Sequence, residues 1–266
     1  MRTIVIQNVD RNTSPRDYKD LAGLAVTSMF RTLQGEGPLA GRPAVFLRLA
    51  GCNYGSKTDF CLFCDTSFQF DAKQIIGVPE LLAKLLELRK SPKDILVITG
   101  GEPTLQTALL GLIVQAKGYF SSIQIETNGT QPKFFVEAEA RGITGKDFIT
   151  VVSPKANERL KSYPQVHQTV KWWASDFKFV VSADTESAHH TIPDWALHHA
   201  EHGTKDVWVS PMTVYRKSYS GEVSSAWDAA LVDQEATAAN YAYAARYALE
   251  HNLLLSVQVH TLTAIA

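Results

Sequence analysis

Short apolar runs rich in β-branched residues alternate with helical segments along most of this chain. Leucines at helical spacing follow Pro79 and Glu80, which predicts a helix over 79–88, and further helices are predicted from 105 to about 117 and from about 233 to 250. The β-rich runs cover residues 26–34, 44–49, 95–99, 122–126, 149–152, 176–181, 206–209 and 253–259. This order predicts an α/β fold with a parallel sheet, helices outside it, and ligand sites beyond the carboxyl ends of the strands.

Size and composition are consistent with one domain of barrel size. The chain has 266 residues, of which 45% are hydrophobic, so it can bury a full core. Residues 1–25 are expected to form a polar N-terminal extension, and residues 26–266 a single domain. A net charge of -1 argues against a large nucleic-acid footprint, and we expect a small molecule as partner. Neither a membrane span nor a signal peptide is indicated, so the expected location is the cytoplasm.

All three cysteines of the chain fall within one short segment, at Cys52, Cys61 and Cys64. The last two have the C-x2-C spacing with which one loop reaches a single metal centre. Three thiolates are one fewer than a structural zinc site or an ordinary electron-transfer cluster requires. On a 4Fe-4S cluster they leave one iron open to a further ligand.

Two other interpretations of the cysteines remain open at this point. A disulfide is disfavoured by the odd number of cysteines and by the expected reducing compartment. A zinc site with three cysteines and one histidine would need a distant histidine, since none lies between Cys64 and His167.

Several motifs give the chain a resemblance to the radical SAM superfamily. The cysteines are followed by Thr99-Gly100-Gly101-Glu102-Pro103. Within the superfamily the chain resembles 7-carboxy-7-deazaguanine synthase from about Val26 to the last residue, through the segments 33–37, 41–43 with Arg48, 51–53, 64–66, 126–129 and 153–155. The resemblance implies an incomplete TIM-type parallel barrel of about six strands.

Two features depart from the family pattern. Members usually have three residues between the first two cysteines, whereas this chain has eight. Because two sulfurs on one cluster lie only several ångströms apart, residues 53–60 must fold back on themselves. The family often has Gln-Pro where this chain has Ser210-Pro211, so a water could replace the glutamine contact there.

The resemblance also implies the cofactors and their sites. Cys52, Cys61 and Cys64 would hold a 4Fe-4S cluster whose open iron binds S-adenosylmethionine (SAM). Residues expected to contact SAM are Phe63, Cys64, Asp65, Gly101, Glu102, Ser153, Pro154, Lys155, Ser210, Pro211, Met212 and Thr213. Thr66 matches the magnesium ligand of the family, a hard oxygen suited to Mg2+.

The implied reaction is the lyase conversion of 6-carboxy-5,6,7,8-tetrahydropterin to 7-carboxy-7-deazaguanine with loss of ammonia, in the queuosine pathway. Arg48 would bind the substrate carboxylate, although a buried ion pair is the alternative role for this side chain. The pterin N–H donors require acceptors, for which the candidates are Leu33, Gln34, Gly35, Glu36, Thr99, His260 and the terminal carboxylate of Ala266.

The resemblance also implies protein partners, and other functions remain open. An external one-electron donor such as flavodoxin or ferredoxin and a homodimer are expected, and a direct nucleic-acid or membrane partner is not. Another small radical SAM enzyme, such as a glycyl-radical activase, and a non-enzymatic zinc module remain alternatives.

Residues 189–202 contain five histidines, which could form a second metal site or line a solvated helix. Residues 213–227 are expected to form a long loop near the active-site mouth.

Overall fold

The computed structural model describes residues 4–5, 21–54, 75–215 and 232–259. Its strands are β1 (Ile4–Val5), β2 (Leu24–Leu33), β3 (Pro43–Leu49), β4 (Ile75–Ile76), β5 (Ile95–Gly100), β6 (Ile123–Thr127), β7 (Ile149–Val152), β8 (Asp176–Val181), β9 (Asp206–Pro211) and β10 (Leu254–Leu255). Its α-helices are α1 (Val78–Leu88), α2 (Leu109–Ala116), α3 (Pro132–Ala140), α4 (Gln168–Trp173), α5 (Asp194–Glu201) and α6 (Gln234–Glu250). Two short 3-10 helices, η2 (Gly37–Leu39) and η4 (Pro103–Leu105), precede β3 and α2.

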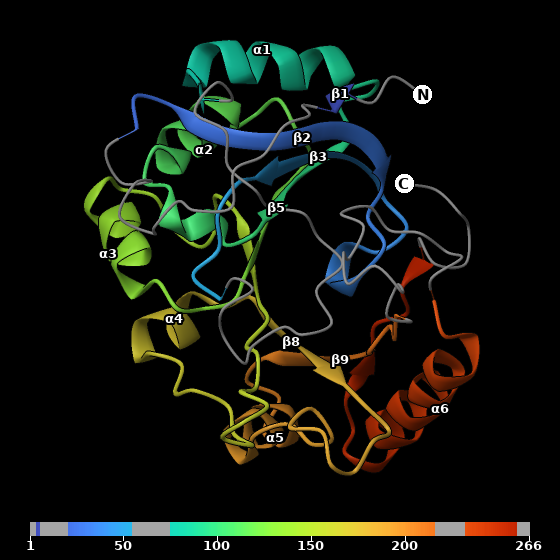
Figure 1. The fold of residues 1–266 in the computed structure, drawn as a ribbon. Helices are drawn as coiled ribbons and strands as arrows, with labels where there is room; N and C mark the ends of the chain where they lie inside the picture. Colours follow the sequence, from blue (N-terminus) through green and yellow to red (C-terminus); the bar gives the residue numbers. More distant parts are fainter. Residues whose placement is uncertain (1–3, 6–20, 55–74, 216–231, 260–266) are drawn as a thin grey trace.

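The sheet has a parallel core with an antiparallel beginning. Its order is β1-β2-β3-β5-β6-β7-β8-β9-β10, and β4 pairs with β2. From β3 to β10 every neighbouring pair is parallel, whereas β1 and β3 both run antiparallel to β2. The curved sheet is open between its first and last strands, with the helices outside it (Figure 1). The predicted incomplete barrel of about six parallel strands is confirmed, with β10 as a seventh, two-residue strand.

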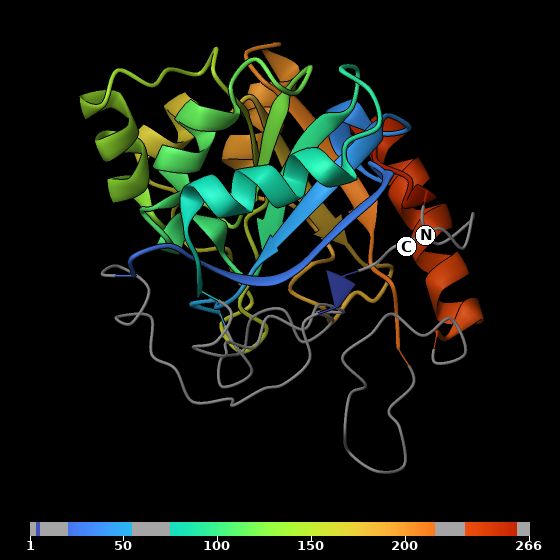
Figure 2. The same ribbon diagram turned by 90° about the horizontal axis from the view of Figure 1, so that it is seen from above.

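Each core strand presents one face to the helices and the other to the barrel interior. In β8, Phe177 and Phe179 belong to the large cluster under the helices, while Lys178 between them faces the opposite way. In β6, Ile123 and Ile125 belong to the same outer cluster, and Glu126 faces inward. This alternation places charged side chains inside the barrel while the outer core stays apolar. Figure 2 shows α1 against one side of the sheet and α6 at its far end.

Two predicted elements differ in extent from the observed ones. The segment 105–117 is not one helix, because Gln106 is extended between η4 and α2. Its buried side chain accepts from the backbone N–H of Ala25 at 2.8 Å and donates to the carbonyl of Ala50 at 2.9 Å. The predicted strand at 253–259 is confined to Leu254–Leu255, since the backbone N–H of Val259 donates to Gly35 instead.

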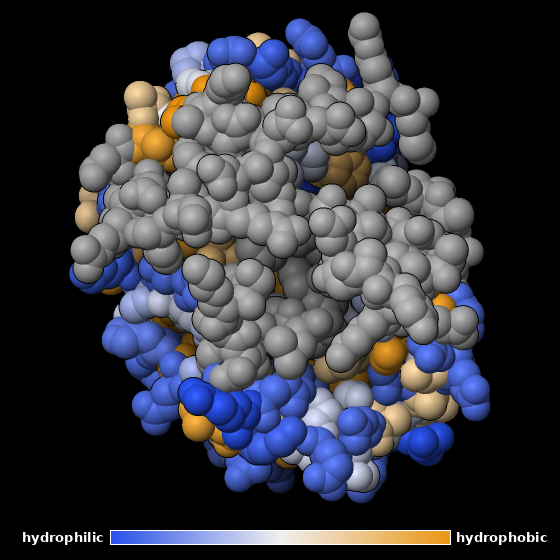
Figure 3. Space-filling model, viewed as in Figure 1, coloured by the Kyte–Doolittle hydropathy of each residue, from blue (hydrophilic) through white to orange (hydrophobic). Residues whose placement is uncertain are grey.

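The described surface carries scattered hydrophobic side chains among hydrophilic ones on the face in Figure 3. Large exposed hydrophobic residues include Trp172 and Leu249, on α4 and α6. Among the described residues, no helix has both the length and the apolar character needed to cross a bilayer.

Candidate active site

Cys52 lies directly beyond the carboxyl end of β3, where the parallel sheet predicts a site. The backbone N–H of Glu102 donates to the carbonyl of Gly51 at 2.8 Å, and that of Gly101 donates to Leu49 at 3.2 Å. These bonds fasten the cysteine segment to the loop after β5. The half-buried Cys52 thiol accepts from the backbone N–H of Tyr54 at 3.4 Å. Such an N–H···S contact stabilises a thiolate, the form that binds metals.

Gly100 and Gly101 permit the close approach of these two loops. Gly100 has φ +143, and a Cβ there would collide with the backbone of Leu49. At Gly101 a Cβ would lie 2.7 Å from the Cβ of Cys52 and still closer to the carbonyl of Gly51. Gly101 is expected to contact SAM. In the structure both glycines let the cysteine segment pack against the end of β5.

Glu102 is fully buried and joins the ends of β5 and β6. One carboxylate oxygen accepts from the backbone N–H of Thr104 at 3.0 Å and from the Thr127 hydroxyl at 2.6 Å. The other accepts from the backbone N–H of Asn128 at 2.6 Å. Burial raises the pKa of Glu102 although these donors act in the opposite direction. Its expected contact with SAM stays a prediction.

Asn53 links the cysteine segment to the loop after β6. Its side-chain oxygen accepts from the Asn128 amide at 3.0 Å, and its amide donates to the Thr130 hydroxyl at 2.9 Å. The loops after β3, β5 and β6 are therefore cross-connected at one end of the barrel. Asn53 and Asn128 belong to the sequence motifs, but no local pattern indicates a role for either of them or for Thr130.

Arg48 and Thr99 are register partners on β3 and β5, so their side chains leave the same face of the sheet. The outer cluster takes Leu47 and Leu49 from β3, which leaves Arg48 on the inner face, half-buried. The structure thus brings the predicted carboxylate ligand and one predicted pterin ligand together on the barrel interior.

The segment 34–37, with Leu33 at the end of β2 before it, crosses the open side of the barrel. The N–H of Gly37 donates to the Ser256 hydroxyl at 3.0 Å, and the carbonyl of Gly35 accepts from the N–H of Val259 at 3.0 Å. The segment predicted to bind the substrate thus contacts the residues that follow β10, the last strand of the sheet.

A polar network extends from this crossing into the interior. The Gln258 amide donates to Glu36 at 2.9 Å, and the Thr213 hydroxyl donates to the Gln258 oxygen at 2.7 Å. Lys178 donates to Glu36 at 2.7 Å and to Glu126 at 2.9 Å. The Gln34 amide lies 3.4 Å from Glu126. Sequence reasoning missed Lys178 and Glu126 as site residues, because only the folded sheet brings them beside Glu36.

The remaining residues predicted to contact SAM follow β7 and end β9. Ser153, Pro154 and Lys155 come directly after β7, and the Lys155 ammonium donates to the Ser153 carbonyl at 2.6 Å. Ser210 and Pro211 are the last residues of β9, and Met212 follows with its N–H bonded to Val181.

The donor set that the structure describes is compatible with the implied cofactors. Cys52 lies half-buried at the strand end, where its sulfur accepts from the backbone N–H of Tyr54. The Ser210 hydroxyl is buried and has no hydrogen-bond partner among the described residues, which leaves it available to a ligand or a water. Several predicted residues lie outside the described part of the chain, namely Cys61, Phe63, Cys64, Asp65, Thr66, His260 and Ala266.

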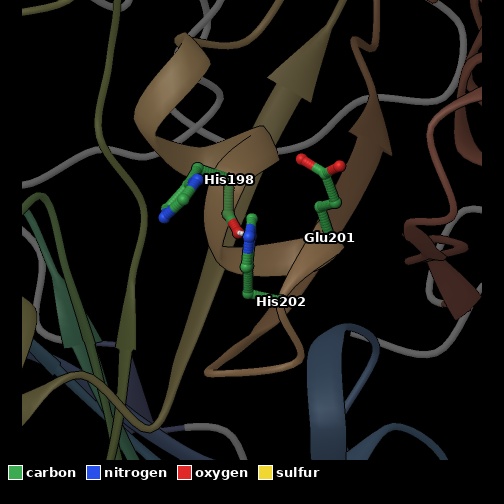
Figure 4. Close-up of side chains that lie close together, drawn as sticks. All are labelled: His198, Glu201 and His202. Atoms are coloured by element: carbon green, nitrogen blue, oxygen red, sulfur yellow. Dashed lines mark hydrogen bonds between the residues drawn. The ribbon is translucent and has the colours of Figure 1, made fainter.

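The histidine-rich segment has two different environments. His198, Glu201 and His202 are exposed on the last turn of α5 and its C-cap, with ligand atoms within 4.8 Å of one another. Figure 4 shows the His202 ring beside the carbonyl of His198. The Nδ1 atom of His202 lies 2.9 Å from that carbonyl oxygen. His189, in contrast, is fully buried against Tyr163. The exposed group is a solvated helix end, and a metal there stays an untested interpretation.

Comparison with known proteins agrees with this geometry. Residues 47–150 match the family model described as the radical SAM superfamily. The 7-carboxy-7-deazaguanine synthase of Rhodospirillum rubrum is 42% identical over 127 residues, which cover 47% of this chain and 48% of that protein. The enzyme of the same name from Rickettsia prowazekii is 35% identical, with 60% of this chain and 62% of that protein covered. The chain thus spans about half to three fifths of these two relatives.

Two further similarities extend over more of the chain. The crystal structure of QueE from Escherichia coli shares the fold with a TM-score of 0.56 at 23% identity, covering 94% of this chain and 100% of that one. The 7-carboxy-7-deazaguanine synthase of Pyrobaculum aerophilum is 33% identical over 213 residues, which cover 77% of this chain and 87% of that protein. With this degree of identity over most of a relative's length, the chain belongs to the 7-carboxy-7-deazaguanine synthase family of radical SAM proteins.

Proposed function

We propose that this protein converts 6-carboxy-5,6,7,8-tetrahydropterin to 7-carboxy-7-deazaguanine with loss of ammonia. The main support is the 33% sequence identity to the 7-carboxy-7-deazaguanine synthase of Pyrobaculum aerophilum, in an alignment that covers 87% of that protein. The cross-connected loops that hold Cys52 at the carboxyl ends of β3, β5 and β6 support it, because ligand sites of barrels lie at this end.

Cys52, Cys61 and Cys64 would hold the 4Fe-4S cluster, and the strand-end loops would hold SAM. When bound, the cluster and SAM together supply a radical that abstracts hydrogen from the substrate. The chain itself binds, orients and shields. Gly101 packs directly against the cysteine segment at Cys52, and Ser210 offers a buried hydroxyl.

The substrate would lie on the inner face of the barrel. Arg48 can offer two parallel donors to its carboxylate, and Thr99 lies beside Arg48 in register. Glu36 and Gln34 supply acceptors for the N–H groups of the pterin ring. Both belong to the segment that closes the open side of the barrel.

Further parts of the proposal rest on the family resemblance. Thr66 would be a ligand of Mg2+ beside the substrate carboxylate. An external one-electron donor would reduce the cluster, and two chains would form a homodimer.

The test is anaerobic reconstitution with iron and sulfide, followed by incubation with SAM, reductant and the carboxytetrahydropterin. We expect a brown protein with visible absorption and a product with the mass of 7-carboxy-7-deazaguanine. Omission of SAM should abolish the product. Formation of 5′-deoxyadenosine without a deazaguanine product would assign the chain to another radical SAM reaction.

A further inference from the structure

Lys178 has a charged side chain deep in the barrel, and its ammonium lies between two carboxylates. Its side chain is 9% exposed, on the inner face of β8 between Phe177 and Phe179 of the outer core. The ammonium lies 2.7 Å from Glu36 and 2.9 Å from Glu126, whose side chains are 21% and 15% exposed. Three segments that are distant in the sequence therefore meet at one cation.

Every oxygen of the two carboxylates has a donor. Glu36 accepts from Lys178 on one oxygen and from the Gln258 amide on the other. Glu126 accepts from Lys178 on one oxygen and from the Gln124 amide, at 2.6 Å, on the other. The orientation of both carboxylates is therefore determined by chain groups before any ligand arrives.

The charges of this triad depend on one another. Burial by itself would lower the pKa of Lys178, but Glu126 and Glu36 raise it overall, so the ammonium stays charged at neutral pH. Without the ammonium, two partly buried carboxylates would face each other with no cation between them. The two carboxylates would repel each other, and Glu36 would no longer be held in one direction as an acceptor for the N–H groups of a pterin.

We propose that Lys178 is a positioning residue for the pterin, which holds Glu36 and Glu126 as oriented acceptors on the inner face of the barrel. The inference rests on the proposed function, because it takes the substrate from there. Lys178 itself does not need to touch the substrate. It acts through the two carboxylates, and through Glu36 it supports the segment that closes the barrel.

The test compares Lys178→Met, Lys178→Arg and the double variant Lys178→Met with Glu126→Gln, each anaerobically reconstituted to equal iron content. KM for the carboxytetrahydropterin, kcat, SAM cleavage without substrate and melting temperature are measured for each. We expect Lys178→Met to raise KM roughly 10- to 100-fold, the size of a lost hydrogen bond to a charged group. Substrate-free SAM cleavage should stay within about twofold, because it needs only the cluster and SAM.

The other variants separate positioning from folding. Lys178→Arg retains a cation that can bridge two carboxylates, so its KM should lie closer to wild type than that of Lys178→Met. The double variant carries the same net charge as wild type, so it should regain thermal stability while its KM stays high. Lys117→Met removes a surface partner of Asp147 and is the matched control, expected to leave KM unchanged.

The possible outcomes distinguish a wrong role for Lys178 from a wrong proposed function. If wild type converts the pterin and Lys178→Met does so with an unchanged KM, the positioning role is wrong and the function stands. Recovery of both KM and stability in the double variant would also overturn it, because charge balance alone would then suffice. If wild-type protein neither binds nor converts the pterin, both the function and the role of Lys178 are wrong.

Discussion

At the scale of single residues, buried charges in this protein are matched by different partners. Asp94 accepts from the Arg31 guanidinium at 2.8 Å, and this bond lowers the pKa of Asp94. Glu102 has no cation within the described hydrogen bonds and is held by hydroxyl and backbone donors. Lys178 is held by two carboxylates. The surroundings therefore shift the pKa values of the two acids in opposite directions, downward for Asp94 beside Arg31 and upward for buried Glu102.

Cys52→Ala should abolish cluster binding while the protein stays folded. Cys52 lies in a loop after β3 and is half-buried, so loss of its sulfur leaves the core intact. Iron content, visible absorption and SAM cleavage measure the loss, and circular dichroism measures the fold. The same result is expected for Cys61→Ala and Cys64→Ala. A variant that cleaves SAM at the wild-type rate would remove that cysteine from the ligand set.

Thr66→Val should weaken the dependence of turnover on Mg2+, because a methyl group cannot coordinate a hard cation although the side-chain shape is kept. Product formation is measured against Mg2+ concentration in both proteins. SAM cleavage without substrate should be less affected than product formation. An identical Mg2+ response in the variant would show that Thr66 is not a ligand.

At the scale of elements, Gly101→Ala should displace the cysteine segment from the loop after β5. The new Cβ would meet the Gly51 carbonyl and the Cys52 Cβ, and backbone cannot rotate away as a long side chain can. Overpacking of this kind costs about 1–3 kcal/mol. We expect lower iron incorporation and a lower melting temperature.

Gly111→Ala is the control for this effect. Gly111 lies inside α2, and its nearest contact would be Val78 Cγ2 at an ordinary 3.9 Å. Alanine stabilises a helix relative to glycine, by about 1 kcal/mol at most, so stability should be unchanged or higher. Equal iron content in Gly101→Ala and Gly111→Ala would contradict the packing argument.

His189, in the connection between β8 and α5, should make the free energy of unfolding decrease in acid. Burial, aided by Lys155, lowers the pKa of His189 to about 4. The unfolded chain binds a proton near pH 6.5, so the folded state binds fewer protons between these values. The stabilising contribution of neutral His189 is therefore complete above about pH 6.5 and decreases as the pH falls toward 4. At pH 5 the loss amounts to about 2 kcal/mol.

Chemical denaturation at pH 7.5 and pH 5 measures this loss. His189→Gln should show a smaller decrease in unfolding free energy between the two values than wild type. His198→Gln, on the exposed end of α5, should behave as wild type does. The same pH dependence in His189→Gln and wild type would assign the acid sensitivity to other groups.

At the scale of the whole molecule, the open side of the barrel is bridged by hydrogen bonds. The described bonds join Gly35 and Gly37 to Val259 and Ser256, and Glu36 to Gln258. The two ends of the sheet are thus connected through the segment that we expect to bind the pterin. We therefore expect substrate binding and the closure of the barrel to depend on the same residues.

Ser256→Ala should weaken this closure. Ser256 is 2% exposed, and its hydroxyl is the acceptor of the Gly37 N–H. An N–H left buried without an acceptor costs about 1–3 kcal/mol. The melting temperature should fall, and KM for the pterin should rise more than kcat falls, because the bridge orients Glu36.

Ser121→Ala is the matched control, since it removes a hydroxyl that donates to the carbonyls of Lys93 and Asp94 at an exposed bend and makes no described bond to the bridge. It should change neither KM nor stability measurably. A KM for Ser256→Ala equal to that of Ser121→Ala would separate the bridge from substrate binding.

The sequence by itself determined the order of elements and the family. Short apolar, β-rich runs and leucines at helical spacing indicated the parallel strands and the helices, because these patterns are local. The clustered cysteines and the Gly100-Gly101-Glu102 motif indicated the metal-binding chemistry for the same reason. Even the position of Cys52 beyond β3 followed from the rule that sites lie at the carboxyl ends of parallel strands.

Only the tertiary structure decided which distant residues meet. Gln106 interrupts a predicted helix because it bonds to backbone 81 and 56 residues away. Lys178 lies 142 residues from Glu36 and 52 from Glu126, and no local pattern marks such a triad. β10 is short because the chain after it leaves the sheet for residues 35–37. Hydrogen bonds and charge pairs between distant segments depend on how the sheet curves, and that curvature arises from packing the whole chain.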